Sequence, residues 1–94
     1  MKHHIIVKFS ESAPALDAML PRIDEIFSGV TQVPGVHSYE LIRNCIDRSN
    51  RYHLMIVIDM DKEALEAYDD CAPHHQWKDE FTPLIEKKAI FDSE

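Results

Sequence analysis

The segment Tyr52–Met60 limits the choice of fold more than any other part of the sequence. Both faces of the strand that it predicts are apolar, because two apolar sets alternate along it: Leu54, Ile56, Ile58 and Met60, and between them Met55 and Val57. A strand of this kind is typical of the centre of a sheet that is covered on both sides. The fold must therefore supply cover for two faces of a sheet.

The remaining segments predict the element order β-α-β-β-α-β. The predicted strands are His3–Phe9, Val36–Arg43, Tyr52–Met60 and Lys88–Asp92, and the predicted helical stretches follow Ser12 and span Lys62–Asp70 and His74–Lys87. This order is typical of the α+β class with a ferredoxin-like antiparallel sheet, in which the first and third strands are central. In that topology the helices cover only one face of the sheet.

Proline residues complicate the helical patterns. The first helix has an apolar stripe at steps of three and four residues, formed by Leu16, Leu20, Ile23, Phe27 and Val30. Ser12 is expected to cap this helix, and Pro21 is expected either to kink it or to divide it into two short helices. Asp61 is expected to cap the next helix, which the run Cys71-Ala72-Pro73 interrupts.

The helix-free face of such a sheet is also apolar in this sequence. The third strand is apolar on both faces, and the first strand carries Ile6 opposite Ile5 and Val7. A naked apolar sheet face is typical of an interaction surface. We therefore expect a homodimer in which two sheets close into a barrel-like interface, a dimeric α+β barrel. The alternative is that loops or the short acidic C-terminal tail cover this face.

Length and charge exclude several functional classes. The 94 residues are expected to form one domain, and the net charge of −7 argues against nucleic acid or an anionic membrane as a partner. No apolar stretch approaches the ~20 residues that span a bilayer, and the beginning of the sequence does not have the pattern of a signal peptide. Cys45 and Cys71 are far apart, so we expect two reduced thiols and a cytoplasmic location.

Four segments, taken in order, carry a family resemblance. They are Lys2-His3 with Ile5-Ile6-Val7-Lys8-Phe9, Val33-Pro34-Gly35-Val36 with Arg43-Asn44, Ala64-Leu65-Glu66-Ala67-Tyr68 with Pro73-His74, and Ile90-Phe91-Asp92. Together they resemble the stress-responsive dimeric α/β-barrel (Dabb) family over nearly the whole chain. The resemblance implies a ferredoxin-like dimeric barrel but no single function, because members include proteins without an assigned activity, proteins linked to stress tolerance and a plant polyketide cyclase.

The resemblance to the cyclase implies roles for individual residues. It implies that Tyr68 and His74 correspond to the catalytic tyrosine and histidine, that His3 and His53 correspond to two pocket histidines, and that Trp77 corresponds to an aromatic pocket residue. The family usually has His where this chain has Cys71, which alters the turn before His74. Members of the wider family also place Mg²⁺ against backbone carbonyls in the region that corresponds to residues 30–36.

The chemistry of Tyr68 and His74 suits enolisation or aldol condensation. A tyrosine hydroxyl can hold a carbonyl oxygen on which charge develops, and a neutral imidazole can take an α-proton. The alternative is that Tyr68 packs in the core and His74 lies at the start of a helix. His3 and His53 begin antiparallel strands and should lie at opposite ends of the sheet, and no metal-ligand spacing occurs, so we expect no metal site. Cys71 and His74 match no nucleophilic arrangement.

Three functions remain open from the sequence. The first is a Dabb-type protein that binds a small apolar or carbonyl-containing molecule between the helices and the sheet, without a cofactor. The residues expected to line that pocket are His3, Ile5, Val7, His53, Met55, Tyr68, His74, Trp77 and Ile90. The second is a cyclase-like or isomerase-like enzyme with His74 as the base and Tyr68 as the carbonyl-orienting group. The third is an assembly protein with no ligand.

Overall fold

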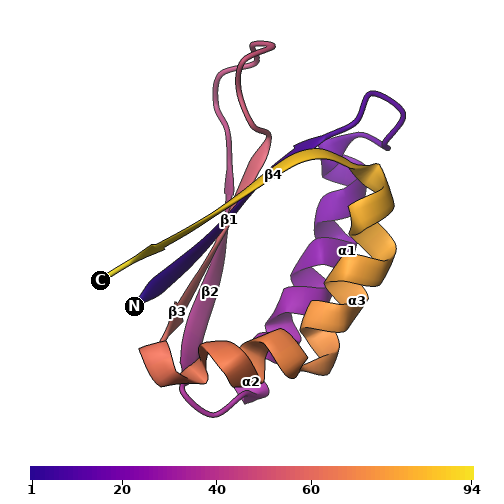
Figure 1. Ribbon diagram of the computed structural model, residues 1–94. Helices are drawn as coiled ribbons and strands as arrows, with labels where there is room; N and C mark the ends of the chain where they lie inside the picture. Colours follow the sequence, from indigo (N-terminus) through magenta and orange to yellow (C-terminus); the bar gives the residue numbers. More distant parts are fainter.

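The computed structural model describes residues 1–94 and consists of one sheet and three helices (Figure 1). The strands are β1 (Lys2–Phe9), β2 (Val36–Arg43), β3 (Leu54–Met60) and β4 (Ile85–Ser93), and the helices are α1 (Leu16–Ser28), α2 (Leu65–Asp70) and α3 (Ala72–Phe81). Short 3₁₀ turns η1, η2 and η3 span Gly29–Gln32, Lys62–Ala64 and Thr82–Leu84. No helix is both long enough and apolar enough to cross a bilayer.

The sheet has the strand order β2-β3-β1-β4, and all neighbouring strands are antiparallel. The strands β1 and β3 are therefore central, and the three helices lie on one side of the sheet (Figure 1). This arrangement confirms the predicted α+β ferredoxin-like fold. It leaves the other face of the sheet uncovered by any element of the chain.

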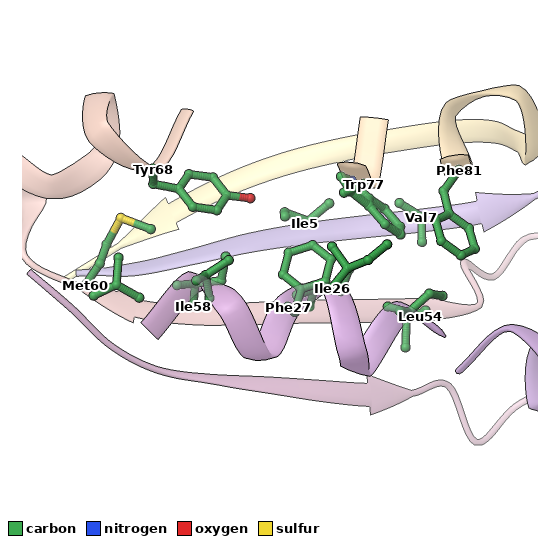
Figure 2. Packing of buried hydrophobic residues seen from close by; sticks show 14 of the residues in the cluster. Ile5, Val7, Ile26, Phe27, Leu54, Ile58, Met60, Tyr68, Trp77 and Phe81 are labelled. Atoms are coloured by element: carbon green, nitrogen blue, oxygen red, sulfur yellow. The ribbon is translucent and has the colours of Figure 1, made fainter. Parts of the chain in front are cut away.

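The hydrophobic core fills the space between the helices and the sheet (Figure 2). Ile56 and Ile58 on β3 are fully buried there, as are Ile23 and Phe27 on α1. Trp77 on α3 packs its ring against two other aromatic side chains, those of Phe27 and Phe81, with ring centroids 5.3 and 5.1 Å apart. Burial of these large side chains contributes on the order of 1.5–3 kcal/mol each, and it fixes α1 and α3 against the central strands.

The first helix differs from its sequence prediction at its beginning and at Pro21. Helix α1 begins at Leu16 with Ala15 in the N-cap position, so Ser12 is not its cap. The Ser12 hydroxyl instead hydrogen-bonds the Ser10 hydroxyl at 3.1 Å within the preceding turn. Pro21 lies inside a single continuous helix, so the alternative of two short helices is wrong. Packing of the buried side of α1 outweighs the roughly 3 kcal/mol that an interior proline costs.

The last helix and strand also have different bounds from those predicted. Helix α3 spans Ala72–Phe81, two residues earlier at its start and six residues shorter at its end than the predicted His74–Lys87. Pro83 lacks the N–H that would continue the helix, and it lies in η3. Strand β4 therefore begins at Ile85 and not at Lys88, and Ile85 pairs with Phe9.

The uncovered face of the sheet carries an apolar row across all four strands. Residues that pair across the sheet in this row are Ile42 on β2, Met55 on β3, Ile6 on β1 and Ala89 on β4. The adjacent row includes Val57 and Phe91, and the Phe91 side chain is 62 % exposed. Because side chains alternate along a strand, Met55 and Val57 point away from the helices while Ile56 and Ile58 point into the core. This surface is called the open face below.

Candidate functional site

Tyr68 is on α2, and its side chain is completely buried. Figure 2 shows its ring in the layer between the helices and the sheet, with the hydroxyl directed away from α2. That hydroxyl has no hydrogen-bond partner and is the one buried side-chain polar atom of the chain without one. Burial, which disfavours the charged phenolate, raises the pKa of Tyr68 well above its ordinary value. The hydroxyl is therefore a protonated donor without an acceptor.

His74 lies in the first turn of α3 beside Tyr68, with ring centroids 4.9 Å apart. Its Nδ1–H donates a hydrogen bond to the Asp69 carbonyl oxygen at 2.8 Å. Because a carbonyl can only accept, Nδ1 carries the proton and Nε2 of the neutral ring keeps its lone pair. Burial lowers the pKa of His74 below 6.5, although the bond to the Asp69 carbonyl acts in the opposite direction. The imidazole is thus neutral, and basic at Nε2, near pH 7.

The local sequence explains how α2 and α3 bring these two side chains together. Helix α2 ends at Asp70 because Cys71 is extended, with φ −74° and ψ 156°. Cys71 is also the N-cap residue of α3, where Pro73 occupies the first turn and needs no N–H partner. The break between the helices folds the His74 ring back over the end of α2. Cys71 and Cys45 are both free, as expected from the sequence.

His3 on β1 forms the third side of the group, and only 6 % of this residue is exposed. Its ring makes an edge contact with Tyr68, with centroids 5.4 Å apart. His3 Nδ1 donates to Asp92 Oδ1 at 2.5 Å, because β1 and β4 pair with His3 opposite Asp92. A carboxylate on one ring nitrogen fixes the orientation of the imidazole and directs Nε2 away from Asp92. The sequence alone assigned no role to Asp92. Its contact with His3 depends on the register of β1 with β4, which the sequence does not reveal.

A cleft of about 310 Å³ opens over this group. It is lined by His3, Leu65, Asp69, His74, Lys78, Lys88, Ile90 and Asp92. Tyr68 lies beneath the cleft, in ring contact with both lining histidines. The volume is at the lower end of the range for small-molecule sites, roughly 300–1,000 Å³. We call this arrangement of Tyr68, His74, His3 and Asp92 the tyrosine–histidine site.

Several residues expected in the same pocket lie elsewhere. Ile5, Val7 and Trp77 are buried in the core and do not line the cleft. Met55 lies on the open face, because its neighbours Leu54 and Ile56 occupy the core side of β3. Of the expected set, the structure brings together Tyr68, His74, His3 and Ile90.

His53 is at the other end of the sheet from His3. Its backbone N–H donates to the Val7 carbonyl oxygen at 2.9 Å, whereas His3 pairs with Ile58. The His53 ring stacks on Phe9, and its Nδ1 accepts a hydrogen bond from the Phe9 N–H at 2.9 Å. The antiparallel pairing of β1 with β3 thus separates the two histidines, as the order of the strands led us to expect.

Backbone carbonyls in residues 30–36, where the family resemblance implies a magnesium position, already take part in the fold's own hydrogen bonds. Mg²⁺ requires nearly octahedral oxygen coordination. The carbonyls of Val30, Val33 and Gly35 each accept a backbone N–H, and the Asp61 carboxylate accepts a bond from His37 at 2.9 Å. The chain also gathers no group of three or more His, Cys, Asp or Glu side chains that could hold a metal ion.

Solved structures with the same fold were found at low sequence identity. A dimeric ferredoxin-like protein of unknown function from Thermobifida fusca has a TM-score of 0.79 at 14 % identity, over 96 % of this chain and 85 % of that one. A Dabb family protein from Mesorhizobium loti has a TM-score of 0.66 at 18 % identity, over 99 % and 93 %. A hydroxynitrile lyase from Passiflora edulis has a TM-score of 0.73 at 11 % identity, over 96 % and 87 %.

These similarities confirm the Dabb resemblance at the level of the fold. No protein-family model and no curated protein sequence matches the chain. The shared feature of the three structures is therefore the ferredoxin-like architecture, and two of them are known by that architecture and not by an activity.

The lowered pKa of His74 predicts a specific pH dependence of stability. The folded state binds the proton less readily than the unfolded chain, whose histidine has a pKa of 6.5. The free energy of unfolding is therefore greatest above pH 6.5 and falls as the pH drops from there through the folded-state pKa. The measurement is urea unfolding at one protein concentration and at several pH values, from neutral pH down to values below 6.5.

The matched variants are His74→Gln and His75→Gln, since His75 is the exposed neighbour. We expect His74→Gln to lose less stability on acidification than the wild type, whereas His75→Gln follows the wild type. An unchanged loss of stability on acidification in His74→Gln would contradict the assignment of a half-buried neutral imidazole.

Proposed function

We propose that this chain is a Dabb-type domain that binds a small carbonyl compound at the tyrosine–histidine site. The observation that carries the proposal is the Tyr68 hydroxyl, which is fully buried and has no hydrogen-bond partner. Leaving such a group unsatisfied costs about 1–3 kcal/mol, and buried polar groups are seldom left unpaired in native proteins. A ligand oxygen that accepts this hydrogen bond would recover that cost.

A carbonyl oxygen is the acceptor that fits this position best. It offers lone pairs without adding a second donor beside the two histidine rings, and it brings little charge into a buried site. The raised pKa of Tyr68 keeps the hydroxyl protonated over the whole physiological range. Tyr68 does not itself line the cleft, so a ligand that bonds its hydroxyl has to displace lining side chains, such as those of His3, His74 or the 48 % exposed Ile90.

Proton transfer at the same site is the second candidate function, and the state of His74 favours it. The neutral imidazole presents Nε2 as a base, because Nδ1–H is held by the Asp69 carbonyl. With a ketone bound to Tyr68, Nε2 would take a proton from the carbon next to the carbonyl, and the negative charge that develops on the oxygen would face the hydroxyl. The hydroxynitrile lyase with the same fold from Passiflora edulis supports the view that this architecture can carry an enzyme activity.

The second imidazole of the site, that of His3, also lines the cleft. His3 is held by Asp92, so its Nε2 is available on the side away from that carboxylate. A group fixed in this way can position the ligand without taking part in the proton transfer. We assign His3 and Asp92 as positioning residues. The alternative function, an assembly protein without a ligand, predicts that no small molecule binds at this site.

Removal of the Tyr68 hydroxyl should weaken ligand binding. Acetophenone is a suitable probe because it joins a ketone to an apolar ring, and its binding can be followed by shifts of backbone amide signals. One hydrogen bond contributes about 0.5–1.5 kcal/mol net, so Tyr68→Phe should raise the Kd roughly twofold to tenfold. Tyr39→Phe is the matched control, because the Tyr39 hydroxyl is already bonded to Asp24. Equal affinity in wild type and Tyr68→Phe would contradict the proposal, and no binding at all would favour the assembly function.

Removal of the His74 imidazole should abolish proton exchange on the bound ketone. Exchange of the acetophenone methyl protons in D₂O, followed by NMR, measures enolisation directly. A positioned general base contributes about 10²–10⁴-fold, so His74→Gln should slow the protein-dependent exchange at least 100-fold, while His75→Gln exchanges like the wild type. Binding without any exchange in the wild type would leave the protein as a binder and rule out the catalytic role for this ketone.

We further propose that a second copy of the chain covers the open face. Ionic side chains on this face differ in sign between its two sides: Glu40 and Asp59 lie on the β2–β3 side, and Lys8 and Lys87 lie on the β1–β4 side, where Lys8 also pairs with Glu86 at 3.6 Å. A second sheet rotated about an axis along the strands would place its acidic side opposite the basic side of the first. Apolar burial and opposite charges would then favour the same arrangement.

A charge placed on the exposed part of this face should dissociate the dimer. Phe91→Asp is expected to raise the dimer Kd by more than about tenfold, because it removes a large apolar contact and adds a desolvated carboxylate. Since Phe91 is exposed in the single chain, the variant should keep its fold. Sedimentation velocity measures the assembly, and Gln76→Asp on the exposed side of α3 is the control. A wild-type chain that is a folded monomer would overturn the proposed interface.

A further inference from the structure

A second cavity lies at the opposite end of the molecule from the tyrosine–histidine site. It has a volume of about 380 Å³ and is bounded by the end of β1, the beginning of α1 and the loop that joins β2 to β3. Figure 1 shows that this loop and the loop between β1 and α1 project at the same end of the domain. The cavity shares no lining residue with the tyrosine–histidine site.

Three arginines line this cavity, although the chain as a whole has a net charge of −7. Arg43 is paired with the Asp17 carboxylate at 2.5 Å, but Arg48 and Arg51 have no carboxylate within 4 Å. Asp47 is the one acidic residue of the lining. The local excess of positive charge is therefore not neutralised by the protein, and guanidinium groups bind carboxylates and phosphates through paired N–H donors.

His53 adds a further donor to the same cavity. Its Nδ1 accepts the Phe9 N–H, so the proton of the neutral ring is on Nε2, which is left to donate. The loop that carries Arg48 and Arg51 is held at its base and near its middle. Asn44 Nδ2 donates to the Tyr52 carbonyl oxygen at 2.9 Å, and Lys8 Nζ donates to the Ser49 carbonyl oxygen at 2.6 Å. Arg48 and Arg51 thus stand on a loop that is tied to the sheet, and Arg43 is the last residue of β2.

The remaining wall of the cavity is apolar. Phe9, Leu16 and Met19 contribute to it from β1 and α1, and Ile46 adds an apolar side chain from the loop that carries Arg48 and Arg51. A site that combines cationic and apolar side chains suits a ligand that has an anionic group and an apolar part. Inorganic ions alone would leave the apolar wall in contact with water.

We propose that this cavity binds an amphiphilic anion, a small molecule with a carboxylate or phosphate group on an apolar chain. The anionic group pairs with Arg48 and Arg51 and accepts the His53 Nε2–H. The apolar chain lies against Phe9 and Met19. This site is independent of the tyrosine–histidine site, since the two cavities are at opposite ends of β1.

Titration with octanoate, octyl phosphate and octanol tests this proposal in the full chain. Amide signals in NMR spectra report both the affinity and the location. We expect saturable binding of at least one of the two anions, with shifts confined to residues around Arg48, Arg51 and His53, and much weaker binding of octanol. Which anion binds more tightly identifies the head group. Absence of saturable binding by both anions, or shifts centred on Tyr68 and His74, would overturn the proposal.

Matched charge variants separate a specific site from general attraction. A charge-assisted hydrogen bond that is lost in Arg48→Ser or Arg51→Ser should raise the Kd about tenfold. Lys62→Ser removes the same charge far from the cavity and should leave the Kd unchanged. Equal weakening by Lys62→Ser would overturn the proposal, because binding would then follow net charge only. Both arginines extend from a surface loop, so their replacement is not expected to unfold the chain.

Discussion

The antiparallel pairing of β1 with β3 is the interaction on which the rest of the structure depends. It places Ile5 opposite Ile56, so that the helix-facing sides of both central strands form one apolar surface under α1 and α3. The same pairing determines which residues of β1 and β3 lie at each end of the sheet. His3 therefore lies under α2 and His53 lies beside the start of α1, and the two cavities form at the two ends of one strand.

Residues that follow a local pattern could be predicted from the sequence, and residues placed by long-range pairing could not. The alternation along β3 was sufficient to identify the central strand and the open face. The bounds of α3 and β4 were wrong because Pro83 ends the helix earlier than the apolar spacing indicates. The separation of His3 from His53 follows from strand order, whereas the bond from His3 to Asp92 depends on the register of β1 with β4, for which the sequence holds no local signal.

In the tyrosine–histidine site, a break between two short helices brings two functional side chains into contact. Tyr68 is buried because α2 packs its inner side on the sheet, and His74 is held over it because Cys71 and Pro73 end one helix and begin the next. Family resemblance identified both side chains, but their protonation states follow from burial and from the Asp69 carbonyl. The altered turn at Cys71 leaves the two rings in contact.

The unsatisfied hydroxyl of Tyr68 also bears on how this protein can evolve. In the free chain a phenylalanine at this position would fill nearly the same volume and would bury no unpaired polar atom, so random substitution combined with selection for stability alone favours its loss. Under the proposed function, ligand binding is the second selective pressure that keeps a tyrosine there. On that proposal the hydroxyl serves binding and not folding, and a lineage that no longer binds the ligand is free to replace Tyr68 by phenylalanine.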